Sequence, residues 1–302
     1  MSVLSSFPAM PNRIAITCEY LWYIGPIGAN RESIESQLSP KLKEAKEEGQ
    51  VGSTIAKDVI TEMVNLKLLE ILDNGNIVLI EELRNIIPAA DDWQKTLRPI
   101  LSQKMLYPDQ AELFKQSEFS YALAWLLTQD PFTPLLRSKG QHVEKINTQL
   151  EESDPLRYTI ANDSRWQNLL YWGRYFGCVE WLGIGNNKFV IPDPSEAIIL
   201  QLPIIFAAET ELPISKFVEQ LGQAFPVLEG GEARENLEAK MLDQFKRQFE
   251  YLSRSTSLAL KRLELRGVIK IKAISDAKSW ILDLGEKTLP ISHIEMVKRE
   301  LA

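Results

Sequence analysis

Basic side chains gather near the C-terminal end of the chain, where they could contact the phosphates of a nucleic acid. Positions 246–278 hold nine Lys and Arg residues against three acidic ones, a local charge of +6, whereas the rest of the chain carries −13. Lys and Arg neutralise phosphates and release condensed counterions, which makes such binding sensitive to salt. The candidate DNA-binding residues are Arg254, Ser257, Lys261, Arg262, Arg266, Lys270, Lys272 and Lys278.

The spacing of these residues predicts a helix that could enter the major groove, followed by strands that could touch flanking phosphates. Ser257 and the basic residues of the helix are expected on its outer face. Lys270 and Lys272 alternate with isoleucines, so both lysines should share one face of a strand. The charges could instead serve solubility, or dock on an acidic partner or on acidic modules of this chain. The inward positions of the helix are expected to be Leu252, Leu258, Leu260, Leu263 and Leu265.

The residue types that most enzymes need are sparse in this chain. It has two cysteines and two histidines, Cys18, Cys178, His142 and His293, all far apart in sequence. No zinc-ligand spacing results, and a histidine-based triad has little support. Neither a GxxxxGK(S/T) phosphate loop nor a GxSxG elbow occurs. We therefore expect no enzymatic activity, no catalytic residues, no bound metal and no cofactor, with both thiols buried and reduced.

An amphipathic helix followed directly by a short hairpin occurs three times, over 54–80, 164–191 and 255–284. A helix that leads into a two-stranded hairpin is the second half of a winged helix-turn-helix. The sequence therefore predicts a mainly α protein with short β-hairpin wings, built from tandem winged helix-turn-helix modules. The expected domains are an N-terminal winged-helix domain over 1–90, a helical middle domain with a winged-helix-like hairpin over 91–194, and a C-terminal basic winged-helix domain over 195–302.

The first module is expected to be a poor DNA reader. A flexible leader precedes it, and its third helix should expose the side chains of Lys57, Asp58, Thr61 and Glu62. Because carboxylates repel phosphates, this module is expected to pack on a protein partner or on a second copy of the chain.

In the third module, the segments VIKIKAI and WILDL are predicted to pair as the wing. The final stretch, 291–302, is predicted to be a short terminal helix. Lys270 and Lys272 of the first wing strand would each contact a phosphate.

The most aromatic stretch of the chain lies in the middle module and contains Tyr171, Trp172, Tyr175, Phe176 and Trp181. Aromatic platforms can stack the bases of single-stranded nucleic acid. Aromatic residues at helical spacing more often build a core, and no basic run is interleaved with them here. We therefore expect these rings to be mainly core.

The overall charge and hydropathy limit the class of protein. The net charge of −7 opposes non-specific nucleic-acid binding by the whole surface but allows a local basic face. No stretch approaches the roughly 18 apolar residues of a membrane span, and the N-terminus lacks the basic and apolar regions of a secretory signal. We expect a cytoplasmic protein with no membrane partner.

Several segments resemble bacterial multi-winged-helix proteins encoded in mobile defence or DNA-modification islands. They are PNRI near the N-terminus, DNGNIVLI in the first hairpin, and LPISKFVEQLGQAFP with LALKRLELRGVIKI near the C-terminus. The proteins that the chain resembles include DpdG-like accessory proteins of the 7-deazaguanine DNA-modification cluster. The resemblance implies a non-enzymatic subunit that works with helicases, nucleases or modification enzymes on phage or plasmid DNA. It implies no catalytic residues.

Together these features predict a non-enzymatic, DNA-associated adaptor subunit. Its C-terminal module would bind double-stranded DNA, and its acidic modules would hold protein subunits of a larger complex, with homo-oligomer formation left open. One alternative is a purely protein–protein scaffold subunit, whose basic patch meets an acidic subunit. Another is a ligand-responsive transcription regulator with a small-molecule pocket in the aromatic middle module.

Overall fold

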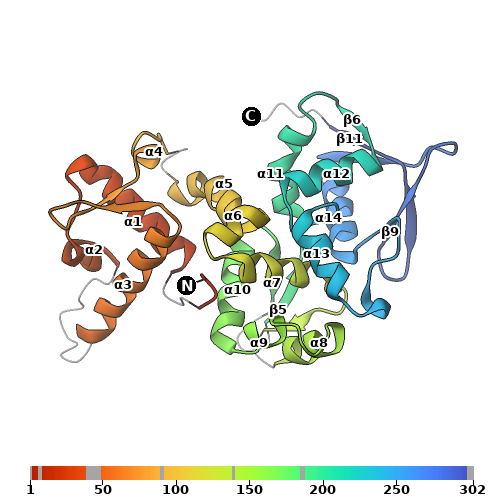
Figure 1. Ribbon diagram of the computed structural model, residues 1–302. Coiled ribbons are helices and arrows are strands. Elements are labelled where there is room, and N and C mark those ends of the chain that lie inside the picture. The colour runs from red at the N-terminus through yellow and green to blue at the C-terminus, as the bar shows by residue number, and fades with distance from the viewer. Residues whose placement is uncertain are drawn as a thin grey trace.

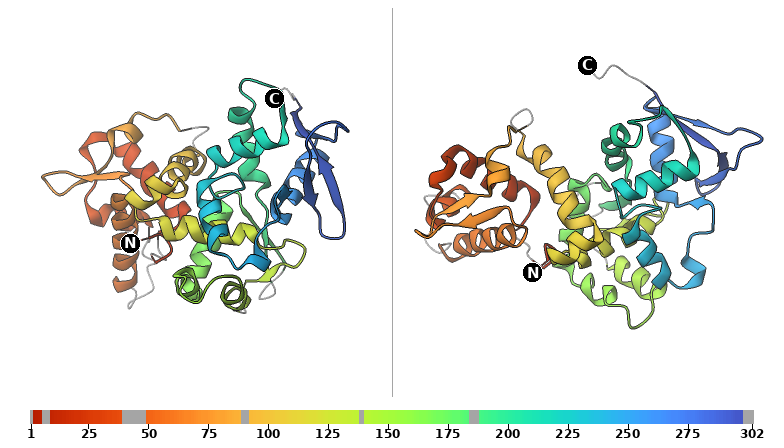
Figure 2. Two further views of the ribbon diagram at one scale, coloured as in Figure 1. Left: turned by 45° about the vertical axis from the view of Figure 1, so that its right-hand side comes forward. Right: turned by 45° about the horizontal axis from the view of Figure 1, so that its top comes forward.

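The computed structural model describes residues 2–5, 9–38, 49–88, 92–137, 140–183 and 188–297, and this part of the chain is mainly helical with small sheets. Figure 1 shows the N-terminal elements on one side, the helices α5–α10 in the centre and the C-terminal elements on the other side. The two rotated views keep the same order (Figure 2). Within the described residues, no helix has the length and apolar character that crossing a membrane requires.

Within its described residues, the N-terminal module contains four helices, a short 3-10 turn and one hairpin. The hairpin predicted at its end is confirmed, because β1 and β2 pair antiparallel from Leu69–Leu79 to Ile71–Ile77. Gly75 turns the chain between them at φ 81°, a backbone conformation that glycine adopts without strain. The elements are α1 (Pro11–Ile24), η1 (Gly25–Ile27), α2 (Arg31–Leu38), α3 (Gly49–Asn65), β1 (Leu69–Ile71), β2 (Ile77–Leu79) and α4 (Glu81–Arg84).

The middle module is built around α7, of whose twelve residues eight are buried. Its predicted hairpin also forms, with β4 antiparallel to β5, and β3 adds to the other edge of β5. The elements are α5 (Trp93–Leu106), α6 (Pro108–Leu113), α7 (Ser117–Thr128), β3 (Leu135–Leu136), α8 (Gln141–Gln149), α9 (Leu156–Thr159), α10 (Asp163–Tyr175), β4 (Val179–Leu182) and β5 (Phe189–Pro192).

More of the described strands lie in the C-terminal module than in either of the other two modules. Its elements are α11 (Ser195–Ile205), β6 (Glu211–Pro213), α12 (Ile214–Ala224), α13 (Glu232–Lys240), η3 (Asp243–Phe245), β7 (Tyr251–Leu252), α14 (Arg254–Leu265), β8 (Ile269–Lys272), β9 (Trp280–Asp283), β10 (Thr288–Ile291) and β11 (His293–Met296). They form two three-stranded sheets, β6-β11-β8 and β10-β9-β7, in which only β7 and β9 run parallel.

Two predictions for this module are wrong. The segments VIKIKAI and WILDL do not pair, because β8 pairs with β11 whereas β9 pairs with β10. The predicted terminal helix is replaced by strand over residues 291–296, and 298–302 lie outside the described residues. Between β6 and β8, the strand β11 finds hydrogen-bonding partners on both sides, and the buried Ile294 faces Leu212 and Ile271 there. These contacts outweigh the weak helical preference of the segment.

The same strand order recurs in all three modules. In each module a short extended segment between two helices pairs with the last strand of the core sheet, so that the last strand lies in the centre. In the first module this segment is the single bridge Ala29–Ile77 beside β2; in the others it is β3 beside β5 and β6 beside β11. Segments of one to three residues are too short to show the apolar–polar alternation of a strand, so the sequence patterns did not predict them.

One apolar core runs through the three modules. The N-terminal leader is part of it, and the expectation of a flexible leader is wrong for the described residues. Val3 and Leu4 are fully buried, and the Asn168 amide on α10 donates to both of their carbonyl oxygens at 3.1 and 3.0 Å. The Trp172 indole donates to the Ala9 carbonyl at 3.2 Å. Two apolar leader residues and a buried amide therefore tie the first segment to the middle module.

Gly222 on α12 tests how closely two backbone segments of the C-terminal module approach each other. A Cβ at this position would lie 2.0 Å from the carbonyl carbon of Gly230 and 2.3 Å from the Gly231 nitrogen. Backbone atoms cannot rotate away, so we expect Gly222→Ala to lower the free energy of unfolding by about 3 kcal/mol in urea titrations. Gln223→Ala, at the exposed neighbouring position, should change it by less than about 0.5 kcal/mol. Equal effects of the two substitutions would contradict the close approach.

Candidate nucleic-acid interface

The helix α14, which carries the predicted DNA contacts, begins against the middle module. Ser253 caps it, with its side chain accepting from the Thr256 backbone N–H. Ser255, in its first turn, is fully buried and donates to the Leu127 carbonyl of α7 at 2.5 Å. The N-terminal residues of a recognition helix are the ones that reach base edges in a groove. In this arrangement, those residues of α14 face protein.

A buried carboxylate holds the start of α14 in place. Glu229 is fully buried; it accepts from the Ser253 backbone N–H at 2.9 Å and from the Thr256 hydroxyl at 2.6 Å. The guanidinium of Arg234, itself 1% exposed, lies 3.7 Å away. Burial alone would raise the pKa of Glu229, but Arg234, Arg247 and the two hydrogen bonds outweigh it and lower the pKa to about 2. The carboxylate is therefore ionised and fully partnered.

Two predicted positions on α14 are wrong. Ser257 is fully buried, and its hydroxyl donates to the Leu252 carbonyl and accepts from the Asp283 backbone N–H at 3.0 Å. Leu265, predicted to face inward, is 78% exposed. The strands β7 and β9 pair in parallel beside α14. They cover the side of this helix that the sequence predicts to be exposed. Ser257 therefore joins helix to sheet and faces away from solvent.

The arginines of α14 form ion pairs with carboxylates from outside the helix. Arg254 contacts Asp130 at the end of α7 at 2.5 Å and Asp283 on β9 at 3.0 Å. Arg262 pairs with the nearly buried Asp193 before α11. Just beyond the helix, Arg266 pairs with Glu196 at 2.7 Å. Three of the predicted phosphate contacts thus meet acidic groups from other elements of the same chain.

Most of the lysines are paired as well. Lys261 meets Glu264 at 2.5 Å, Lys278 meets Glu250 at 2.6 Å, and Lys272 lies between Glu211 and Glu295 at 2.6 and 2.9 Å. Lys270 is exposed, and no described carboxylate forms an ion pair with it, although Glu295 is its neighbour in the sheet register. That these cations contact DNA stays a prediction. DNA binding would require most of them to break an ion pair with a carboxylate and to form one with a phosphate.

The energetic barrier to that exchange differs along α14. Ion pairs between partly exposed side chains contribute at most about 1 kcal/mol each, so phosphates could compete for Arg266 or Lys278. The buried first turn is a stronger obstacle, because exposing it would remove the hydrogen bonds of Ser255 and uncover the charge of Glu229. The geometry therefore favours α14 as a structural helix over a groove-reading one.

In the first module, one residue of α3 that the sequence predicts to be exposed is buried instead. Glu62 on α3 is 1% exposed, and its carboxylate accepts from the Gln116 amide of the middle module at 2.7 Å. The expectation that Glu62 is exposed is therefore wrong, whereas Lys57 and Thr61 are exposed as expected. Gln116 also donates to the Phe114 carbonyl and accepts from the Val3 backbone N–H, so one amide joins leader, first module and middle module.

The aromatic stretch is divided between core and surface. Trp172, Tyr175 and Phe176 are buried, which confirms the core interpretation for these three rings. Tyr171 and Trp181 are half-buried and meet edge to face, with their ring centres 5.4 Å apart.

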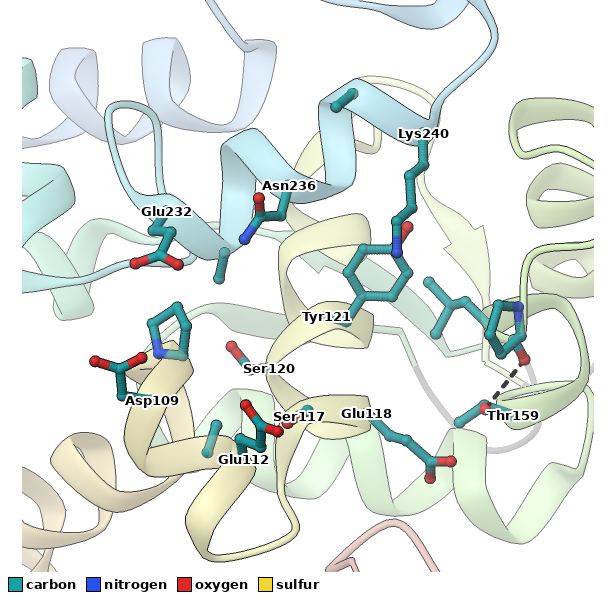
Figure 3. Close-up of a pocket in the computed structure, with 16 residues that line it drawn as sticks. Asp109, Glu112, Ser117, Glu118, Ser120, Tyr121, Thr159, Glu232, Asn236 and Lys240 are labelled. Atoms are coloured by element: carbon teal, nitrogen blue, oxygen red, sulfur yellow. Dashed lines mark hydrogen bonds between the residues drawn. The ribbon is translucent and has the colours of Figure 1, made fainter.

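A cavity of about 590 Å³ lies between the middle and C-terminal modules. Figure 3 shows Tyr121 of α7 at its centre, with Asn236 and Lys240 of α13 across from Ser117 and Glu118. The Tyr121 hydroxyl donates to Asp154 at 2.9 Å, and the Lys240 ammonium lies 5.0 Å from the Tyr121 ring centre. None of the five predicted aromatic residues lines this cavity, so the observed hollow differs from the small-molecule pocket expected in that stretch.

Comparison with known protein families identifies the chain. A family described as DpdG-like matches residues 1–277, which is most of the sequence. The chain belongs to the DpdG-like family. This confirms the resemblance seen in the sequence, whose segments lie within the matched residues. Neither a curated protein nor a solved structure matches the chain.

Removing single arginines should separate structural from superficial ion pairs. Arg262→Ala leaves the buried Asp193 without its guanidinium, and we expect a loss of about 1 kcal/mol after allowance for the exposed half of Arg262. Arg266→Ala breaks a pair that is half exposed on both sides, and should cost less than about 0.5 kcal/mol. Urea unfolding of both variants measures the difference, and a larger loss in Arg266→Ala would contradict this ranking.

The Glu229 network predicts an acid-sensitive component of stability. Arg234, Arg247 and the two hydrogen bonds lower the pKa of Glu229 to about 2 in the folded chain, from the 4.5 of a glutamate in water. Its contribution is therefore complete above pH 4.5 and is lost as the pH falls towards 2, a difference of about 3 kcal/mol. Glu229→Gln should lose stability at pH 7 and show a flatter dependence between pH 4.5 and 2, measured by urea unfolding at each pH. An unchanged slope in the variant would contradict the network.

Proposed function

We propose that this DpdG-like protein is a non-enzymatic adaptor subunit of a DNA-modification system, built from three winged helix-turn-helix modules and associated with duplex DNA. Family membership supports the link to DNA modification. The modular architecture supports the adaptor role, because three similar units in one body can offer separate surfaces to DNA and to protein partners.

The observation that carries the proposal is the threefold repetition of one topology. Each module has a short extended segment between helices, followed by the strands that complete a sheet, with the last strand in the centre. In a winged helix-turn-helix, this order places the third helix and the hairpin side by side on one face, where they can contact a groove and its flanking phosphates. Extra strands β9 and β10 and the helix α13 are insertions into the third copy.

The thiols and one imidazole support a non-enzymatic role. Cys18 and Cys178 are fully buried, and burial raises the pKa of both thiols, which disfavours the reactive thiolate. His142 is 1% exposed and stacks on Trp166 with ring centres 4.2 Å apart. Burial lowers the pKa of His142, and its Nε2 lies 3.0 Å from the Ile160 carbonyl oxygen. These groups pack inside modules and are remote from solvent.

A protein–protein scaffold remains the second candidate, and a specific observation favours it. The arginines at positions 254, 262 and 266 are paired within the chain, and the first turn of α14 is buried on α7. If the basic patch serves only to hold the C-terminal module on the rest of the chain, the remaining acidic surface would be left to bind protein subunits. This candidate requires no DNA affinity of the isolated chain.

Fluorescence anisotropy with a labelled duplex, measured across a salt series, tests the proposal. We expect affinity to fall with salt at a log–log slope of about −3 to −5, because each neutralised phosphate contributes about −0.9. Absence of binding at about 50 mM salt would contradict DNA association and favour the scaffold.

The same assay tests the predicted C-terminal DNA face. Arg266→Gln with Lys270→Gln removes two exposed charges from the predicted set. If that set forms the DNA face, affinity should fall about ten-fold and the slope should become shallower by about 2. Unchanged affinity in the folded variant would contradict the C-terminal prediction without affecting DNA association as such.

A further inference from the structure

The middle module gathers three cations around one half-buried tryptophan. The guanidinium carbons of Arg137 and Arg174 lie 4.2 and 5.0 Å from the ring centre of Trp181, and the Lys188 ammonium lies 6.0 Å from it. These are cation–π distances. We call Arg137, Arg174, Trp181 and Lys188 the Trp181 surface. Arg174 is exposed and the other three side chains are half-buried, so the surface is open to solvent.

The sheet register explains why residues far apart in sequence meet here. Trp181 on β4 lies opposite Val190 on β5. Lys188 is two residues before Val190, so it lies on the same face of the sheet as Trp181. The Arg137 backbone N–H donates to the Lys188 carbonyl at 2.8 Å, which continues the pairing of β3 with β5. Arg174 comes from the last turn of α10, the helix that directly precedes the hairpin of the module. The surface thus joins that helix to the hairpin.

Arg137 is held in position by neutral groups. Its Nε donates to the Gln167 side-chain oxygen at 2.6 Å and its Nη2 donates to the Tyr171 hydroxyl at 3.2 Å. Gln167, Tyr171 and Arg174 follow at helical spacing and form the outer face of α10. A guanidinium that is stacked and oriented in this way loses little further entropy when it binds a planar or bidentate anion.

The Trp181 surface differs from the C-terminal patch in its lack of carboxylates. No described acidic side chain forms an ion pair with Arg137, Arg174 or Lys188, whereas the arginines on and next to α14 are all paired. Like charges held close together repel one another, whereas the Trp181 ring attracts each of them. Binding of an anion would remove the repulsion, and a polyanion could neutralise all three cations together.

We propose that the phosphate backbone of duplex DNA binds the Trp181 surface, with the outer face of α10 towards the groove. The proposal rests on the DNA association proposed above and assigns it to the middle module. The third helices of the first and third modules are docked on the middle module through Glu62 and through the first turn of α14, respectively. The outer face of α10, by contrast, carries Gln167, Tyr171 and Arg174. Beside it lie Arg137 and Lys188, with which no described carboxylate forms an ion pair.

Charge reversal at two positions tests this assignment. Arg174→Glu with Lys188→Glu should weaken binding of a labelled duplex by at least about ten-fold at low salt and make the log–log salt slope shallower by about 2. Neither side chain has a described hydrogen bond, so the variant should fold, which thermal unfolding checks. Arg174→Gln with Lys188→Gln should show a smaller loss in the same direction.

The matched control is Lys57→Glu with Lys95→Glu, which changes the net charge equally at exposed positions of other elements. It should bind DNA within about two-fold of the wild type. Equal binding by the wild type and the Arg174→Glu, Lys188→Glu variant would overturn the assignment and leave DNA association standing. If the wild type fails to bind at low salt, both the assignment and the proposed function are overturned.

Discussion

The buried carboxylate of Glu229 is the interaction on which the arrangement of the C-terminal module depends. A charge in the interior persists only when every lone pair has a partner, and Glu229 finds partners in Ser253, Thr256 and Arg234. These contacts fix where α14 begins. Once its first turn is fixed, Ser255 reaches the Leu127 carbonyl and Arg254 reaches Asp130, so the helix is attached to α7. The basic character of α14 is consequently used mainly inside the molecule.

One structural unit is used in different ways within the same chain. The last helix before the hairpin in the first module, α3, directs Glu62 into the middle module, and its counterpart in the third module, α14, directs Ser255 there. Part of the surface of both helices is therefore covered by protein. The corresponding helix of the middle module, α10, receives the leader on one side through Asn168 and keeps Arg174 exposed on another. The surface that remains exposed therefore differs between the three modules.

The cavity beside Tyr121 follows from the same packing. The helix α13 packs on α7 and leaves a hollow that Asn236 and Lys240 line from one side (Figure 3). Since its walls come from two modules, its size depends on their relative position. A ligand that filled it would stabilise the docked arrangement, because binding to one arrangement shifts the population towards it.

The sequence by itself determined the mainly helical class, the first two hairpins and the buried rings of Trp172 and Phe176, because these depend on local periodicity and turn residues. The family followed from the resemblance of several segments to known proteins. The pairing of β8 with β11, the short strands β3 and β6, and the burial of Ser257 and Glu62 were decided by tertiary structure. Each depends on a partner distant in sequence. The same holds for charge: a basic run is visible in the sequence, but whether a cation faces a carboxylate, as at Arg262, or only aromatic and amide groups, as at Arg137, is set by which segments meet in space.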